Sequence, residues 1–539
     1  MRHTMMDFPL TLPTLLERAR APFADVEIVS RMPDRSVRRD TYGAFYTRAR
    51  RLAEALLARG LKKGDRVATL MWNHEPHLVG YFGVPIAGGV IHTLNLRLSP
   101  EDVSFIADDA DDRFLIVDDV LLPLLEKCQR KRPFEAIFVN KTSAAELPAS
   151  YESLEQLLAT AKGEFTYPDL REEDALGMCY TSGTTGRPKG VVYSHRSTVL
   201  HAFATTMTDS LGLGMRDTIL PVVPQFHVNA WGIPFAATMV GAKLVMPGPH
   251  LDAVSVLDLM ASENVTCAAG VPTVWLGILE ALDREPLRWK LKKGLRMIVG
   301  GSAAPESMIR GFDRHGIEII HAWGMTEMSP VGTVCRVRPS LDAEPDDRRY
   351  AVRALQGIHV PFVETRIANA DGGLQPTDGK SSGELEVRGA WVAASYYGTN
   401  DEKERWTKDG WFKTGDVATI DPLGYVKITD RSKDVIKSGG EWISSVELEN
   451  ALMGHPGVRE ACVIAVPNAK WAERPLAAVV LKEGVTSAIE PELVAMLSAK
   501  FAKWWLPDGY VFLEAIPRTS AGKFLKSALR DRYKDWTAK

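Results

Sequence analysis

Short apolar runs alternate with helical patterns through much of the chain, and this alternation restricts its fold more than any other feature. Thr41 can cap a helix that runs to about residue 59, and the run VATLM within 65–72 is typical of a buried strand. The alternation continues as far as the apolar strand expected at 316–320. Strands separated by helices favour a largely parallel sheet with helices on its faces. We therefore expect a large N-terminal α/β domain.

The pattern then changes, and the expected strands become short and the turns dense. Segments such as SSGELEVRG and DGWFKTGD predict a small, mostly antiparallel β-subdomain over about 356–430. Mixed helix and strand patterns follow and predict an α+β C-terminal lobe. The segment DRSKD at 430–434 is polar throughout, as joints between domains commonly are. We therefore predict a large domain over 1–432 and a small domain over 433–539.

The composition excludes several classes of protein. Charged residues make up 25% of the chain and the net charge is −3, so no basic surface field argues for a nucleic-acid partner. The five cysteines form no CxxC pair, which fits a reducing compartment and argues against disulfides or a zinc site. The start, MRHTMMDFPL, lacks a signal-peptide pattern, and no apolar stretch is long enough for a transmembrane segment. We expect a soluble cytoplasmic protein.

One segment, YTSGTTGRPKG at 180–190, has a composition suited to binding an anion. Its glycines let backbone N–H groups approach an anion closely, and its hydroxyls add further donors. Lys189 supplies a mobile cation. The segment is not a Walker loop, because Lys189 lies between Pro188 and Gly190 and not between Gly and Ser or Thr. A flexible surface turn is the alternative, but the density of hydroxyls and glycines favours a polyphosphate loop.

Together with this loop, several separated blocks resemble the acyl-adenylate-forming family of AMP-dependent synthetases and ligases. The blocks are VGGSAAP, AWGMTE, GWFKTGD, DRSKD, IKSGGEWISS and PRTSAGKFLK, and their joint occurrence is more specific than any one of them. The resemblance implies substrates ATP and coenzyme A with Mg²⁺ as the cofactor. It also implies a C-terminal lobe that is mobile, alternating between two orientations about a hinge at Lys433.

The resemblance also implies roles for individual residues. Lys523 would offset the repulsion between the acid's carboxylate and the α-phosphate, Glu327 would hold Mg²⁺, and Thr181 would lie close to the metal. A carboxylate with two oxygens suits the two ribose hydroxyls, which is the role implied for Asp416. Trp323, where the family commonly has Tyr, offers a plane for stacking on adenine. The implied ATP and AMP contacts are Thr181, Ser182, Gly183, Thr184, Thr185, Gly186, Lys189, Gly301, Ser302, Ala303, Ala322, Trp323, Thr326, Asp416, Arg431, Lys433 and Lys437.

Two further blocks concern the acyl group and CoA. His227 and Trp231, in PQFHVNAWG, are four residues apart and would share a face on a helix. The resemblance implies an acyl pocket here, with Trp231 as the gate of an acyl tunnel. It implies a CoA tunnel in the block KSGGEWIS, where the glycines leave space for the narrow pantetheine arm. The residues of that tunnel would be Gly439, Gly440, Glu441 and Trp442.

We therefore predict an AMP-forming acyl-CoA ligase, an acid–thiol ligase that activates a medium- or long-chain fatty acid as acyl-AMP and then transfers the acyl group to CoA. One competing interpretation is a ligase for the short thioether acid 3-methylthiopropionate, because the block AWGMTEMSP of this chain resembles the ligases for that acid. Three more are a peptide-synthetase module, a luciferase-like oxygenase, and a non-catalytic nucleotide- or lipid-binding protein. The joint presence of Thr181, Glu327, Asp416 and Lys523 argues against the last. From the resemblance we also expect a homodimer.

Overall fold

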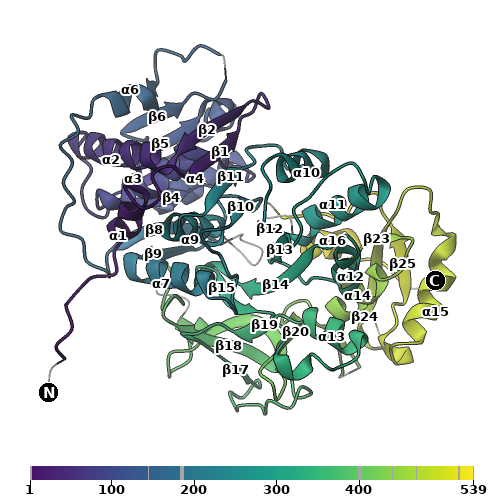
Figure 1. The fold of residues 1–539 in the computed structure, drawn as a ribbon. Helices are drawn as coiled ribbons and strands as arrows, with labels where there is room; N and C mark the ends of the chain where they lie inside the picture. The colour runs from purple at the N-terminus through teal and green to yellow at the C-terminus, as the bar shows by residue number, and fades with distance from the viewer. Residues whose placement is uncertain are drawn as a thin grey trace.

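The computed structural model describes residues 3–143, 145–181, 187–398, 403–439, 441–468, 470–519 and 523–537. Its N-terminal part contains two large sheets with helices packed on them, seen in purple and teal in Figure 1. In the first sheet the spatial order is β7 (Glu152–Ser153), β6 (Ala136–Asn140), β5 (Asp112–Asp118), β3 (Arg66–Leu70), β4 (Val90–Thr93), β8 (Ala175–Tyr180) and β9 (Gly190–Ser194). Neighbouring strands are parallel except β8 and β9, which pair antiparallel and are joined by the 180–190 segment.

The second sheet brings together strands that are far apart in the chain. Its order is β16 (Ile358–His359), β15 (Val331–Val334), β14 (Glu318–Gly324), β13 (Arg296–Val299), β12 (Cys267–Gly270), β10 (Thr218–Pro221), β11 (Lys243–Met246), β1 (Glu27–Arg31) and β2 (Val37–Thr41). The central strands are parallel, and β2, β15 and β16 add antiparallel edges. The expected parallel α/β architecture is confirmed, with antiparallel additions that the alternation of strands and helices does not indicate.

Helices flank these sheets, and local signals explain where several begin. The Thr41 hydroxyl accepts a hydrogen bond from Ala44 N at 3.3 Å, as an N-cap does, and Ser99 caps the helix that begins at Pro100 in the same way. The helix that begins after Thr41 was expected from the sequence and is confirmed. The longer helices of this part are α2 (Tyr42–Ala58), α3 (Glu75–Ile86), α4 (Pro100–Asp109), α7 (His195–Thr206), α9 (Ile233–Val240), α10 (Ala253–Ser262), α11 (Pro272–Arg284), α12 (Glu306–Arg314) and α13 (Asp346–Arg353); the short ones are α1 (Leu12–Leu16), α5 (Leu122–Leu125) and α6 (Leu154–Ala159).

A separate antiparallel sheet follows, shown in green in Figure 1. Its strands are β17 (Val363–Ala368), β18 (Gly383–Gly389), β19 (Phe412–Ile420) and β20 (Val426–Arg431), paired in chain order. It corresponds to the small antiparallel sheet expected from the dense turns of this region. Strand β20 ends at Arg431, and the chain passes directly from there into the C-terminal lobe.

The C-terminal lobe has a sheet and two hydrophobic clusters of its own. Its strands are β22 (Glu441–Ile443), β21 (Ile436–Ser438), β24 (Ala472–Leu481), β23 (Val458–Asn468) and β25 (Gly509–Phe512), and its helices are α14 (Ser445–Met453), α15 (Glu490–Ser498) and α16 (Lys526–Arg532). Alternate residues of β23 point to opposite faces, so Val463 packs with α14 and α15 whereas Ile464 packs with α16. A lobe with its own buried core can behave as a unit.

The lobe docks on the large domain through a few polar contacts. The N-terminus of α14 lies against β20, where Asp430 Oδ2 accepts from Ser445 N at 2.7 Å. On the neighbouring face, Ser307 of α12 donates to Met453 O at 3.4 Å, and Figure 1 shows α12 beside the yellow lobe. Within the ranges given above, no helix combines the length and the apolar character needed to cross a bilayer.

Candidate active site

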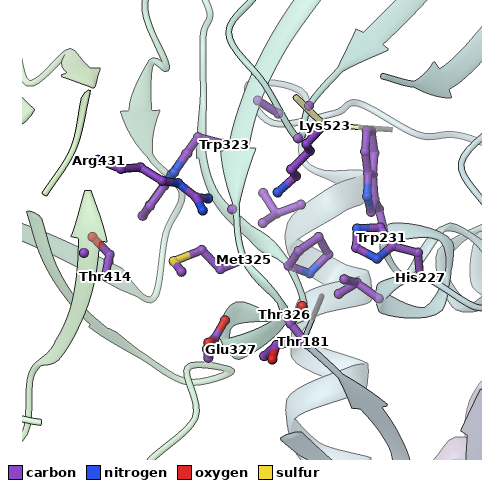
Figure 2. A pocket seen from close by; sticks show the side chains of 18 of the residues that line it. Thr181, His227, Trp231, Trp323, Met325, Thr326, Glu327, Thr414, Arg431 and Lys523 are labelled. Atoms are coloured by element: carbon purple, nitrogen blue, oxygen red, sulfur yellow. The ribbon is translucent and has the colours of Figure 1, made fainter. Parts of the chain in front are cut away.

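A cavity of about 250 Å³ lies where the large domain, the β17–β20 sheet and the lobe meet. The carboxyl ends of β13 and β14 open into it, which is the usual position of ligand sites in parallel α/β sheets. Figure 2 shows the side chains that converge there. Of the residues predicted from the sequence, this cavity is lined by Thr181, Lys189, His227, Trp231, Gly301, Ala322, Trp323, Thr326, Glu327, Arg431, Lys433 and Lys523.

One end of the cavity carries oxygen ligands and a cation. Glu327 is 5% exposed and accepts a hydrogen bond from the Tyr396 hydroxyl at 2.6 Å. Lys189 Nζ lies 5.2 Å from the centre of the same tyrosine ring. Thr326 is fixed through its carbonyl, which accepts from the Tyr193 hydroxyl at 2.8 Å. A buried carboxylate beside hydroxyls and a lysine can hold a hard cation against an anion.

The donor set of this end suits Mg²⁺. Among the described residues there is no group of three or more His, Cys, Asp or Glu side chains that could hold a metal without a substrate. Glu327 supplies one carboxylate, and the hydroxyls of Thr181 and Thr326 line the same cavity. Mg²⁺ prefers oxygen ligands and commonly takes one or two carboxylates together with substrate phosphates. The residues present therefore fit a magnesium ion that binds with a polyphosphate.

An adjoining cavity of about 220 Å³ extends from the same centre toward the lobe. Ser302, Ala303 and Asp416 line it, beside Trp323 and Lys523, which border both cavities. Asp416 is 3% exposed, and its Oδ2 accepts from the Trp323 indole Nε1 at 3.0 Å. Its Oδ1 lies 3.3 Å from Arg431 Nε. A carboxylate, an aromatic plane and a glycine-containing turn thus border one space, an arrangement suited to a nucleoside.

Lys523 reaches from the lobe into this centre. In Figure 2 its amine points into the space between Trp323 and Trp231. A Cβ on Gly301 would lie 3.6 Å from Lys523 Cε, and the φ of +84° at Gly301 is one that glycine adopts without strain. Burial lowers the pKa of Lys523 to about 8, with Arg431 adding to the effect, while Asp416 and Glu327 oppose it. Near neutral pH the amine is still mainly protonated.

The segment that carries His227 and Trp231 is not the α-helix considered in the sequence analysis. Residues Val228–Trp231 (α8) have φ between +46° and +58°, which is a left-handed turn, and Gly232 continues it at +72°. Left-handed backbone costs a non-glycine residue about 1–2 kcal/mol, so packing must impose it. Trp231 lies against Gly300, where a Cβ would be 3.1 Å from the indole ring.

Despite this backbone, His227 and Trp231 border the same cavity. Burial lowers the pKa of His227 to about 3, and the cations Lys523 and Arg97 contribute to that shift. The imidazole is therefore neutral at physiological pH. Leu211, Val228 and Ile298 complete a mainly apolar wall at this end of the cavity, which suits the hydrocarbon part of a ligand.

The remaining predicted residues fall into two groups. Ser182, Gly183, Thr184, Thr185, Gly186 and Gly440 lie outside the described residues, and so do the side chains of Glu441 and Trp442 in β22. Lys437 is exposed, and its backbone N–H donates to Glu473 Oε2 at 2.7 Å. Gly439, with φ of +60°, packs under the Trp471 indole. As the lobe lies in this structure, Lys437 and Gly439 line neither of the two cavities.

Sequence reasoning missed some residues that the structure places in the centre. Tyr396 touches both Glu327 and Lys189, although it lies 69 residues from Glu327 in the chain. Its block, SYYGTN, has no spacing that would have indicated this contact. Arg405 and Thr414 also line the central cavity. Only the folding of the β17–β20 sheet against β14 brings these side chains to the site.

Comparison with known proteins agrees with this geometry. The AMP-binding enzyme family matches residues 16–397, and the AMP-binding enzyme C-terminal domain matches residues 447–523. The chain belongs to the AMP-binding enzyme family. The fold of this AMP-binding enzyme is similar to that of an anthranilate CoA ligase crystallised with anthranoyl-AMP. The two structures superpose with a TM-score of 0.87 at 26% sequence identity, with 98% of each chain covered.

Three curated relatives of this AMP-binding enzyme match it over nearly their whole length. A long-chain-fatty-acid–CoA ligase of Thermus thermophilus is 50% identical, covering 99% of this chain and 97% of the relative. A medium-chain-fatty-acid–CoA ligase of Ectopseudomonas oleovorans is 45% identical, covering 98% and 97%. A 3-methylmercaptopropionyl-CoA ligase of Ruegeria pomeroyi is 44% identical, covering 98% of both. Similarity of this extent covers both the large domain and the lobe.

Proposed function

We propose that this AMP-binding enzyme is an AMP-forming acyl-CoA ligase that activates a medium- or long-chain fatty acid. The observation that carries the proposal is the meeting of Lys523 from the lobe with Glu327 and Trp323 of the large domain around one cavity. That cavity has a polar end for phosphates and an apolar end at Trp231 for an acyl chain. The ligases named among its relatives support the same reaction.

In the first step an oxygen of the fatty acid carboxylate bonds to the α-phosphorus of ATP, and the bond to pyrophosphate breaks. Two anions must approach each other, so Lys523 would offset the charge that builds up on the reacting phosphate. Glu327, with the hydroxyls of Thr181 and Thr326, would hold Mg²⁺, which when bound neutralises charge on the phosphate oxygens. Asp416 would accept the ribose hydroxyls and Lys189 would contact phosphate.

In the second step the CoA sulfur bonds to the acyl carbon, the thiol loses its proton, and AMP leaves with the bonding electron pair. We propose that the lobe, residues 433–539, turns about Lys433 between the two steps and presents the 439–442 segment in place of Lys523. The separate hydrophobic clusters of the lobe support a rigid-body motion. Lys433 is exposed within the short connection from β20 to β21, where backbone angles can change without disturbing a core.

The decisive experiment measures products with a panel of carboxylic acids. We expect CoA-dependent release of AMP and pyrophosphate, and ATP–pyrophosphate exchange when CoA is left out. Formation of ADP and free phosphate would contradict an adenylating mechanism. Absence of exchange with every acid would favour the alternative of a non-catalytic nucleotide- or lipid-binding protein on the same fold.

The identity of the acid is tested by comparing kcat/KM across C4–C16 acids and 3-methylthiopropionate. The second candidate, the thioether acid, is favoured by the bulky Trp231 side chain among the residues that line the cavity and by a relative named for that acid. Trp231→Ala should shift the preference toward longer acids by roughly tenfold, because each accommodated methylene is worth about 0.8 kcal/mol. An unchanged chain-length profile would exclude Trp231 as the gate. Leu211→Ala, which shortens another side chain of the same apolar wall, is the control variant for Trp231→Ala.

Two further properties are proposed, the oligomeric state from the family resemblance and the location from the cysteine pattern. We propose a homodimer in the cytoplasm. Light scattering after gel filtration would measure the mass of the particle against the 59.4 kDa of one chain. Fractionation of cells would show whether the protein stays with the cytoplasmic fraction or follows membranes.

A further inference from the structure

The carboxylate proposed to receive the ribose is held by a neighbouring tryptophan. Trp323 lies at the carboxyl end of β14, and Asp416 belongs to β19, 93 residues further along the chain. The indole Nε1 donates to Asp416 Oδ2 at 3.0 Å, and Arg431 Nε lies 3.3 Å from Oδ1. Each carboxylate oxygen is therefore already approached by one donor before a nucleotide arrives.

The orientation of the indole is itself fixed by packing. A Cβ on Gly332 of β15 would lie 2.9 Å from Trp323 Cζ3, so the ring rests directly on that glycine. The pairing of β14 with β15 shifts register between Trp323 and Gly324, which turns the strand end at this point. The packing of the ring on Gly332 and the turn of the strand end both belong to the large domain, so the large domain sets the direction of the indole N–H bond.

The chemistry of the donor limits what Asp416 can do. An indole offers one N–H and no acceptor, so its partner must act as an acceptor. An ionised carboxylate has about four acceptor positions, of which the indole of Trp323 uses one, while Arg431 forms an ion pair with the other oxygen. One position on each oxygen remains for a hydroxyl group. A pair of such positions matches the two adjacent hydroxyls of a ribose, and it cannot be satisfied fully by a sugar that lacks one of them.

We propose that Trp323 is a positioning residue whose indole N–H orients Asp416, and that it thereby sets selectivity for ribonucleotides over deoxynucleotides. This role is separate from stacking on adenine, which needs only the ring plane. It rests on the proposed function to the extent that the nucleotide binds beside Asp416. A Phe at this position keeps a plane and loses the donor, so the two roles can be separated by substitution.

The test compares ATP with 2′-deoxy-ATP and 3′-deoxy-ATP in ATP–pyrophosphate exchange, for the wild type and for Trp323→Phe. The ratio of kcat/KM for ATP to that for each deoxynucleotide should fall roughly tenfold in the variant, since a hydrogen bond to a charged group is lost for ATP only. If Trp323 acts by stacking alone, all three nucleotides lose the same factor and the ratio is unchanged. That result would overturn the proposal.

Three further variants make the test specific. Asp416→Asn should lower the ratio by itself, and adding Trp323→Phe to it should change the ratio little, because both act through one carboxylate. Trp411→Phe, which removes an indole next to the start of β19, should leave the ratio unchanged. If Trp323→Phe does not fold, Trp323→Tyr is used. Its hydroxyl can donate only from a different position than the indole Nε1, so Asp416 should be oriented less well and we expect a ratio below that of the wild type; a ratio equal to or above it would overturn the proposal.

Equilibrium binding separates failure of this proposal from failure of the proposed function. Calorimetry with AMP and 2′-deoxy-AMP needs no acid and no turnover. Should no acid be activated, the wild type should still prefer AMP and Trp323→Phe should lose that preference. Equal preference in the two proteins would count against the role of Trp323 whatever reaction the enzyme catalyses.

Discussion

Lys523 and Lys526 lie three residues apart and are both largely withdrawn from solvent, yet the charges around them differ: carboxylates surround Lys526, whereas Lys523 faces both cations and carboxylates. Lys526 Nζ forms an ion pair with Glu449 Oε1 at 2.7 Å and donates to Ser445 Oγ, which in turn donates to Asp430. Burial alone would lower the pKa of Lys526, but the carboxylates of Glu449 and Asp430 raise it well above its ordinary value.

Lys523 is surrounded differently, since cations as well as carboxylates face it. Burial and Arg431 lower its pKa to about 8, and Lys433 acts in the same direction. A buried ammonium costs free energy unless a counter-charge approaches it. For Lys526 that charge belongs to the protein, whereas for Lys523 a phosphate of the substrate would supply it. The difference supports the proposal that Lys526 stabilises the lobe whereas Lys523 serves a ligand.

The largest expected effect is on adenylation in Lys523→Ala. Removing a charged group that acts on the developing transition state should lower the rate of ATP–pyrophosphate exchange by about 10³-fold. Thioester formation from supplied acyl-AMP should be nearly unchanged, because the proposed second orientation does not use Lys523. Both half-reactions are measured separately. Equal losses in the two half-reactions would argue against a lobe with two orientations and against a role of Lys523 that is specific to adenylation.

Lys526→Ala should act on stability instead of on chemistry. It leaves the buried carboxylate of Glu449 without its partner, at a cost of about 3 kcal/mol. Because the lobe has its own core, the loss should show as an earlier unfolding transition of the lobe in calorimetry and as faster hydrogen exchange in β23 and β24. Lys523→Ala is the matched control and should not lower that transition. A stable Lys526→Ala protein would show that the ion pair contributes little.

The pH dependence should separate the two lysines further. Lys523 must be protonated to offset phosphate charge, so kcat/KM for adenylation should fall as pH rises through about 8, approaching tenfold per pH unit. In kcat the fall should come at higher pH, since bound phosphate favours the ammonium. Lys523→Arg stays charged and should lose this limb. An unchanged limb in that variant would assign it to another group.

The same shift has a defined sign for stability. The folded pKa of Lys523 lies below the unfolded value of about 10.4, so between those values the unfolded chain binds more protons. The contribution of Lys523 therefore becomes more favourable to folding as pH rises from about 8 toward 10. Loss of this contribution in Lys523→Ala is checked by comparing unfolding of the two proteins at pH 7 and pH 10.

Local sequence was sufficient for much of the fold because it contains the signals that set element ends. Helix α2 and strand β3 lie where the cap at Thr41 and the apolar run VATLM predict them, and the blocks AWGMTE, GWFKTGD and PRTSAGKFLK contain Glu327, Asp416 and Lys523. What these signals could not provide is contact between distant blocks. The hydrogen bonds from Tyr396 to Glu327 and from Trp323 to Asp416 depend on how two sheets meet.

The left-handed turn before Gly232 shows a second limit. Nothing in the letters HVNAW indicates positive φ, and intrinsic preference opposes it. The turn is imposed by packing: Asn229 Oδ1 accepts from the Tyr81 hydroxyl at 3.3 Å, and a Cβ on Gly232 would lie 2.6 Å from His201 Nδ1. A backbone conformation that tertiary packing imposes against local preference cannot be predicted from sequence patterns. The different charges around Lys523 and Lys526 could not be predicted either, because the residues that cause the difference lie in β19, β20 and α14.

The smallest effect is expected when both charges of the Lys526 pair are removed together. Lys526→Met combined with Glu449→Gln leaves neither charge buried, and the Gln oxygen can still accept from Val463 N, as Glu449 does at 2.8 Å. Ser445 N and Oγ keep Asp430 hydrogen-bonded. The double variant should therefore lose only about 1 kcal/mol, less than Lys526→Ala, since replacing a whole buried pair is often neutral. Calorimetry of both single variants and the double variant gives the coupling energy. If the double variant is as unstable as Lys526→Ala, Lys526 acts through Asp430 or through packing, and the contrast with Lys523 no longer rests on the Glu449 charge.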